Sequence, residues 1–183
     1  MKLLAWSAPI TAVSGELLTA AEYNASVRDN LAECAPNIAT QEGSIFQASA
    51  PNRIVERQVV SHRVPEEDSI PTQQTSYVEI RNAGPFVTAV TGASALVFVT
   101  CEMAGNTNTQ CSASFEVSGS TRISASDKWR VVHDAMEKDH FSRYSVARRV
   151  ELNPGSNTFR MKYRTGGLGP FRFRNREIVV IPL

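Results

Sequence analysis

SALVFVTC, residues 94–101, is the most apolar run of this chain and predicts a strand at the centre of a sheet. A second run, CSASFEV at residues 111–117, alternates between apolar and polar side chains, as a strand with one buried face does. The polar loop GNTNTQ separates the two runs, so we expect the second to return antiparallel to the first as a hairpin. This period of two predicts a β domain.

Similar short runs, rich in β-branched and aromatic residues, recur through residues 53–183. They are Arg57–Val64, Thr75–Ile80, Pro85–Val90, Arg143–Val150, Thr158–Arg164 and Arg176–Leu183. Turn sequences such as Asn153-Pro154-Gly155 separate them. About eight short strands at this spacing predict a mostly β fold, an antiparallel β-sandwich or jelly roll, with the strand order left open. Residues 126–140 fit a strand, a loop or a helical turn.

The part before Arg53 has a different pattern. Pro9 and Gly15 discourage a regular helix near the N-terminus, and Trp6 lies there without a local core to bury it. Further on, small and polar residues interrupted by proline and glycine are typical of a linker. We therefore predict an extended attachment arm over residues 1–18, an oligomerisation helix over 19–34, a linker over 35–52 and a β-sandwich domain over 53–183.

The predicted helix runs from Ala20 to about Glu33 and has a strong start. Thr19 is the expected N-cap and Glu22 completes a capping box. Tyr23, Val27 and Leu31 then recur every four residues as one narrow apolar stripe. A helix of this length is marginal alone in water, so the stripe needs a partner, either the rest of the chain or copies of itself.

We expect two contact surfaces in this N-terminal part. Tyr23, Val27 and Leu31 are the candidate oligomer interface, where burial contributes roughly 1.5–3 kcal/mol per side chain. The candidate residues for docking to a larger assembly are Trp6, Leu17 and Leu18.

Composition limits the remaining possibilities. The 183 residues are 42% hydrophobic and 20% charged, with a net charge of +1, so a packed core is expected. No apolar run is long enough to span a membrane, and the N-terminus is too short for a secretion signal, so we expect assembly in the cytoplasm. The 3 cysteines make no disulfide framework. A Cys101–Cys111 bond across the expected hairpin is possible, but free thiols fit a reducing compartment better.

The charges are unevenly distributed along the chain. Residues 1–120 carry 6 Lys or Arg against 12 Asp or Glu, whereas residues 121–183 carry 13 against 6. Such asymmetry fits a nucleic-acid face, packing between copies, or opposite charges that meet inside one fold. Because a nucleic-acid-binding domain is usually more basic overall, we do not expect a nucleic-acid partner.

Motifs for catalysis are missing. The sequence has no phosphate loop, dinucleotide fingerprint, paired CxxC, HExxH or Gly-x-Ser-x-Gly. The segment HDAMEKDH, residues 133–140, offers two His and two Asp, yet its spacing matches no zinc pattern. Glycan hydrolysis needs two carboxylates about 5–10 Å apart, for which only Asp127, Asp134 and Asp139 cluster. We predict no enzyme activity, no cofactor and no metal.

The segment FRFRNR, residues 171–176, is the most unusual polar feature. As a regular strand it places Phe171, Phe173 and Asn175 on one face and three arginines on the other. We expect the phenylalanines to pack inward and the arginines to face solvent or an acidic neighbour. Arg172, Arg174 and Trp129 are the candidate contacts for a ligand or surface. Exposed aromatic residues such as Trp129 and Tyr144 also leave a sugar-binding role open.

Two groups of motifs resemble those of many phage minor tail and fibre-type structural proteins, chiefly of phages of actinobacteria. The first group is Trp6, Gly15-Glu16, Leu18-Thr19-Ala20, Asn24 and Val27-Arg28-Asp29-Asn30-Leu31. The second is FEVSG at 115–119, LNPGSNTF at 152–159, Lys162-Tyr163-Arg164, and Asn175-Arg176 before VVIP at 179–182. The resemblance thus touches both ends of the chain.

The resemblance implies a virion structural protein, assembled in the host cytoplasm, with other phage structural proteins as partners. Such proteins are commonly trimers around the helix, with the N-terminus in the particle and the β domain projecting, in some cases toward a host surface glycan. The single short helix lacks sustained heptads, so we expect a short attachment element. A head fibre or capsid decoration protein is the first alternative, and a carbohydrate-binding module is the second.

Overall fold

The computed structural model describes residues 10–11, 13–32, 34, 39–70, 73–80, 84–135, 137–167 and 170–183. The chain divides into two compact units, Met1–Gln58 and Val59–Leu183, and each is described by itself. Trp6 lies outside the described residues. Within them, no helix has the length and apolar character needed to cross a lipid bilayer.

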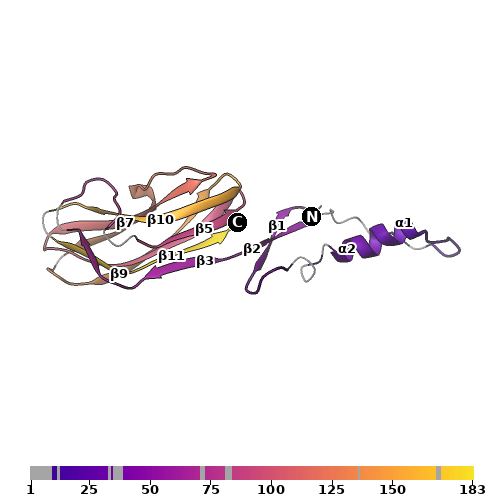
Figure 1. The fold of residues 1–183 in the computed structure, drawn as a ribbon, viewed down its shortest axis with the longest axis horizontal. Helices are drawn as coiled ribbons and strands as arrows, with labels where there is room; N and C mark the ends of the chain where they lie inside the picture. Colours follow the sequence, from indigo (N-terminus) through magenta and orange to yellow (C-terminus); the bar gives the residue numbers. More distant parts are fainter. Residues whose placement is uncertain are drawn as a thin grey trace. The chain divides into compact units, whose positions relative to one another are not determined.

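The second unit consists of two antiparallel sheets (Figure 1). One sheet has the order β5 (Phe86–Thr91), β10 (Gly155–Thr165), β7 (Thr109–Gly119), β8 (Val131–Ala135). The other has the order β3 (Val60–Val64), β11 (Phe171–Pro182), β6 (Ser94–Ala104), β9 (Ser142–Glu151), and β4 (Asp68–Ile70) pairs with β11.

The strand pairs are nested along the chain. β7 pairs with β8, β6 with β9, β5 with β10 and β3 with β11. A long antiparallel ribbon wound in this way into two packed sheets is a jelly roll. The predicted fold class, a mostly β antiparallel sandwich or jelly roll, is therefore confirmed.

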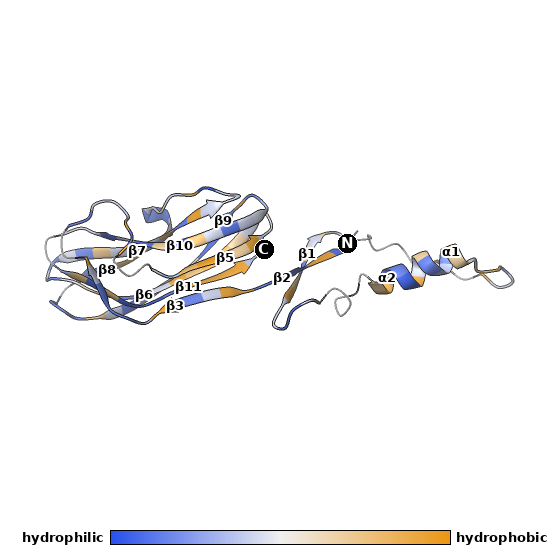
Figure 2. Cartoon of the chain, in the orientation of Figure 1, coloured by the Kyte–Doolittle hydropathy of each residue, from blue (hydrophilic) through white to orange (hydrophobic). Residues whose placement is uncertain are grey.

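The core lies between the two sheets. Along β6, Val97, Val99, Cys101 and Met103 are fully buried, while the residues between them are partly exposed, as the apolar run at 94–101 predicts. β6 lies between β11 and β9, so its central position is also confirmed. Hydrophobic and hydrophilic segments alternate along the strands (Figure 2). The large aromatic residues of the core are Phe115, Phe159, Tyr163, Phe171 and Phe173.

The expected hairpin between residues 94–101 and 111–117 is wrong. β6 and β7 belong to different sheets, because the chain crosses the sandwich between them. β7 is buried on both faces at residues 111–115, since Ser114 donates to the carbonyl of Ser126 and Val117 bridges to Ile123 on a covering segment. Cys101 and Cys111 are free thiols in the core, and burial raises the pKa of Cys111 to about 12.

Residues 75–80 differ from the sequence expectation, whereas residues 126–140 combine two of the structures that the sequence left open. Thr75–Ile80 forms only a single bridge, between Val78 and Tyr163 of β10, instead of a strand. Residues 126–140 contain a short 3-10 turn, Asp127–Trp129, followed by β8. Residues 75–80 make few regular ladder bonds, so their β-branched residues alone overstate their strand character. By contrast, β8 pairs with β7 along its whole length.

The FRFRNR segment does not alternate regularly. The register of β11 against β6 shifts between Arg174 and Glu177, and Asn175 there has a φ of 47°. Asparagine tolerates this left-handed backbone, and the extra residue of such a bulge turns the following side chains over. Arg176 therefore lies fully buried on the inward face with Phe171 and Phe173, and Asn175 is partly exposed. The prediction that Asn175 shares a strand face with Phe171 and Phe173 is therefore wrong.

The first unit contains the helix and a hairpin. The helix comprises α1 (Ala20–Tyr23), a π-helical segment (Asn24–Arg28) and α2 (Asp29–Ala32). Strand β1 (Ile45–Ala50) pairs antiparallel with β2 (Arg53–Arg57), although residues 35–52 are predicted as a linker. The Glu56 carboxylate accepts hydrogen bonds from the hydroxyls of Ser44 and Thr40, which lower its pKa to about 2.

Candidate docking and oligomerisation site

The start of the helix is built as the sequence predicts. Thr19 has an extended backbone and caps the helix, with its hydroxyl oxygen accepting from the Glu22 N–H at 3.2 Å. In return, the Glu22 carboxylate accepts from the Thr19 N–H at 2.9 Å. The Thr19 hydroxyl also donates to this carboxylate at 2.6 Å, and this bond, together with the one from the Thr19 N–H, holds the pKa of Glu22 below its usual value. The capping box fixes the point at which the arm enters the helix.

The middle of the helix is wider than an α-helix. Over Asn24–Arg28 the turns are π-helical, and the Asp29 N–H donates to the carbonyl of Asn24. The Asn30 amide donates to the carbonyl of Ser26 at 2.9 Å, and Asn30 is buried. π-Helical turns are rare and recur at functional sites. Here the π-helical segment begins directly after Tyr23 and includes Val27.

The arm turns back along the helix. The Glu16 N–H donates to the carbonyl of Val13 at 3.2 Å, and Gly15 has a φ of 89°, a conformation that favours glycine. Beyond this turn, the Ile10 N–H donates to the Ser26 hydroxyl at 3.1 Å. The arm is thereby held beside the helix and leaves a space between the two.

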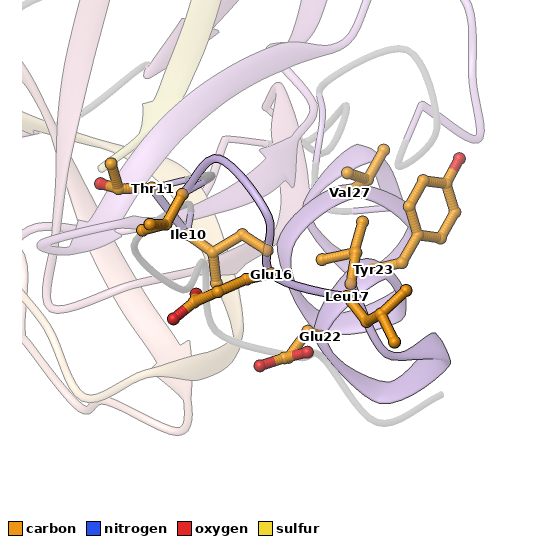
Figure 3. Close-up of a pocket in the computed structure, with 9 residues that line it drawn as sticks. Ile10, Thr11, Glu16, Leu17, Glu22, Tyr23 and Val27 are labelled. Atoms are coloured by element: carbon orange, nitrogen blue, oxygen red, sulfur yellow. The ribbon is translucent and has the colours of Figure 1, made fainter.

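That space is a pocket of about 490 Å³ (Figure 3). The arm and the helix both contribute to its lining, which is mainly apolar with two carboxylates. The lining residues are Ile10, Thr11, Val13, Glu16, Leu17, Leu18, Glu22, Tyr23 and Val27. We name these residues, together with Leu31, the arm–helix surface.

Much of the arm–helix surface is exposed. The exposed fractions are 94% for Leu17, 61% for Leu31, 56% for Leu18, 50% for Tyr23 and 37% for Val27. Side chains of this size are normally buried, and a cluster of them on the surface marks an interaction site. The arm–helix surface is mainly apolar, so it is suited to binding an apolar surface of another molecule.

The structure brings together most residues predicted for docking and oligomerisation. Leu17 and Leu18 of the arm line the same pocket as Tyr23 and Val27 of the helix. Leu31 lies one turn further along and does not line it. Four of the residues that the sequence analysis assigns to two separate surfaces, namely Leu17, Leu18, Tyr23 and Val27, thus line one pocket.

Sequence reasoning missed the arm residues of this pocket, Ile10, Thr11, Val13 and Glu16. Their place depends on the turn at Gly15 and on the bond from Ile10 to Ser26, which joins residues far apart in the sequence. The isolated glycine before an apolar pair was the one available sign that the arm turns there.

The residues predicted for ligand contact lie in the β unit and already have partners. Arg172 pairs with Asp139 at 3.0 Å, and Arg174 pairs with Glu102 at 2.7 Å. Both guanidinium groups stack over the ring of Phe141. Trp129 is elsewhere, half-buried against Phe115 with ring centroids 5.9 Å apart.

The charge asymmetry is balanced in part by ion pairs within the β unit. Acidic residues before position 120 meet basic residues after it. The pairs are Glu79 with Arg160 and Lys162, Glu116 with Lys162, Glu67 with Arg172, and Glu102 with Arg143 and Arg174. Opposite charges that meet inside one fold account for these residues.

The carboxylates considered for catalysis are engaged separately. Asp127 pairs with Arg164 at 2.9 Å, Asp139 pairs with Arg172, and Asp134 accepts from the Gln110 amide at 2.8 Å. In the part of the chain that the structure describes, no three His, Cys, Asp or Glu residues are placed to hold a metal ion.

No family model matches the sequence, and no curated protein matches it. Solved structures do share the fold. The VP2 subviral particle of infectious bursal disease virus aligns with 74% of this chain and 36% of its own, at 11% identity and a TM-score of 0.51. The Gx strain of that virus gives 74% and 36%, at 10% identity and a TM-score of 0.50.

This chain thus spans about a third of the length of those viral proteins. At this identity the likeness shows a shared jelly-roll fold and nothing further. A carbohydrate-binding module of Cellvibrio mixtus lichenase 5A aligns with 66% of this chain and 98% of its own, at 16% identity and a TM-score of 0.32, too low to inform the fold.

Proposed function

We propose that this chain is a phage virion structural protein, a tail-associated minor protein or short fibre. Its N-terminal unit docks to the particle and joins copies of the chain, most simply as a trimer. Its β domain is displayed for host-surface contact or particle stabilisation. The role is non-enzymatic and is carried out in the virion, after assembly in the host cytoplasm.

The arm–helix surface is the observation that carries this proposal. Leu17, Tyr23 and Leu31 expose large apolar areas on a unit whose own helix has only one buried residue, Asn30. Covering each of these side chains contributes roughly 1.5–3 kcal/mol, which is a strong drive toward a partner. An apolar pocket beside an apolar stripe suits two contacts at once, one with a particle protein and one with a second copy.

The β unit supports the display role through its self-sufficiency. It has a complete core, with Phe115, Phe159 and Phe173 fully buried between its sheets. Its charged side chains are largely paired on its own surface. A domain of this kind needs no neighbour for its stability, and its jelly-roll fold occurs in viral capsid proteins.

Three measurements test the proposal. Mass spectrometry of purified particles should find this chain, and cryo-electron microscopy should place its sandwich on the tail. Sedimentation of the purified full chain should give a trimer. A chain that is absent from particles and monomeric at micromolar concentration would contradict both halves of the proposal.

The same imaging distinguishes the main alternative from a tail-associated protein. Density on the capsid in place of the tail would favour a head fibre or capsid decoration protein, which uses the same N-terminal contacts. A carbohydrate-binding module is the second alternative, and the β8–β9 edge of the sandwich, described next, is the observation that favours it as a partial role.

A further inference from the structure

A second cavity, of about 340 Å³, lies where β8 and β9 approach each other. It is lined by residues of β8, of the loop after it and of β9, namely His133, Asp134, Glu137, His140, Ser142 and Tyr144. This volume falls in the range of about 300–1,000 Å³ typical of small-molecule sites. We name it the His133 pocket.

His133 is the best-buried side chain of this set, at 3% exposure. Its Nδ1 lies 3.1 Å from the Tyr144 hydroxyl, and the two rings are 5.5 Å apart. Its Nε2 is buried and has no hydrogen-bond partner in the structure. His133 thus forms the buried part of the lining, while Asp134, Glu137 and His140 form its exposed part.

The charges of the side chains that line the pocket limit the class of ligand that it can bind. Burial lowers the pKa of His133 below its usual value, although the Asp134 carboxylate opposes this shift and His140 adds to it, so the neutral form of the His133 ring is favoured at pH 7. Asp134 and Glu137 supply negative charge, and none of the lining residues is Lys or Arg. This charge disfavours phosphate, sulfate and acidic sugars.

The remaining lining groups both donate and accept hydrogen bonds. Carboxylates accept, the hydroxyls of Ser142 and Tyr144 do both, and a neutral imidazole does one at each nitrogen. A neutral sugar carries several hydroxyls that also do both, and an apolar ring face that can lie against an aromatic ring. A protonated amine only donates hydrogen bonds, so it pairs with the acceptors of this lining and not with its donors.

We propose that the His133 pocket binds one unit of a neutral saccharide, with Asp134 and Glu137 accepting from its hydroxyls and Ser142 and Tyr144 completing the contacts. This deepens the host-surface role in the proposed function by naming its ligand class. All of these residues belong to Val59–Leu183, so the saccharide proposal can fail while N-terminal docking holds, and the reverse.

The full-length protein on an array of neutral glycans tests this, followed by titration calorimetry with the best-bound glycan. We expect Glu137→Gln and Tyr144→Phe each to weaken binding roughly tenfold, because the first replaces a charged acceptor with a neutral amide oxygen and the second removes a hydroxyl. Glu151→Gln is the matched control for Glu137→Gln. Glu151 is an exposed glutamate on β9, the strand that carries Tyr144, and lies outside the pocket. Circular dichroism verifies that each variant is folded.

Three results would overturn the saccharide proposal. The first is the absence of binding to every neutral glycan on the array. The second is glycan binding that both pocket variants leave unchanged. The third is binding of spermine or Zn²⁺ at the pocket, seen as shifted His133 and His140 resonances, while no neutral glycan shifts them. Oligomeric state is measured in the same samples, so loss of docking is recorded separately.

Discussion

In the described part of residues 59–183 most large apolar side chains are buried, whereas in residues 10–32 most of them are exposed. Phe115, Phe159 and Tyr163 lie between two sheets, but Leu17, Leu18 and Leu31 face solvent. The sandwich unit is thus stabilised by its own core. The N-terminal unit is held mainly by polar bonds, such as the capping box and the Glu56 cluster, and keeps its apolar surface free. Exposure of this kind is costly unless a partner covers it.

The most direct test of this difference between the units is to replace apolar residues of the stripe formed by Tyr23, Val27 and Leu31 with charged ones. Val27→Asp with Leu31→Asp should lower the association constant by roughly a hundredfold or more, because two buried apolar contacts are lost and charges introduced. Sedimentation velocity measures the change. The thermal midpoint of the β domain should stay the same, since these residues belong to the other unit.

A matched control uses two exposed alanines of the same helix outside the pocket. Ala21→Asp with Ala25→Asp adds equal charge and should leave the oligomer intact. If the stripe variant remains multimeric, the oligomer is held elsewhere and the arm–helix surface serves docking alone.

A second test targets Arg176, the one charged side chain found in the core among the described residues of the β unit. Arg176 is fully buried and donates from Nη2 to the carbonyl of Glu66 at 3.3 Å, whereas Arg174 on the same strand lies at the surface. Arg176→Ala leaves a cavity and should cost roughly 3 kcal/mol of unfolding free energy. Arg174→Ala should cost less than about 1 kcal/mol, as exposed ion pairs contribute little.

Chemical denaturation measures both values. Equal losses in the two variants would mean that the bulge does not make Arg176 part of the core. Arg176→Met sharpens the result, because it keeps the volume and removes the charge. A variant as stable as the parent would assign the role of Arg176 to packing.

The contrast between units also explains what the sequence could predict. The strands at 94–101 and 143–150 and the capping box of Thr19 and Glu22 were predictable, because each depends on residues close in the sequence. The β6–β7 hairpin was wrong because strand pairing here joins residues far apart, as β3 with β11. No local alternation encodes which sheet a strand enters.

The inward turn of Arg176 was missed for a related reason. Regular alternation was assumed through FRFRNR, and a bulge changes the face of every residue that follows it. Asn175 was the available sign, since asparagine is the residue that most readily adopts a left-handed backbone after glycine. In the arm–helix surface, the helix residues and Leu17 and Leu18 were predictable, whereas Ile10, Thr11 and Val13 were not, because the distant bond from Ile10 to Ser26 places that part of the arm.

The smallest expected effect concerns the polar cluster at Glu56. Hydrogen bonds from Ser44 and Thr40 lower its pKa from 4.5 to about 2. A carboxylate with a lowered pKa stabilises the fold above its unfolded pKa and stops doing so as the pH falls through its folded pKa. The β1–β2 hairpin should therefore loosen between about pH 4.5 and about pH 2, seen as broadened amide resonances of residues 45–57.

Glu56→Gln should remove this pH dependence, and Glu42→Gln, at an exposed position nearby, should keep it. A hairpin unaffected by acid in the parent protein would mean that strand packing, and not this polar cluster, holds the N-terminal unit together.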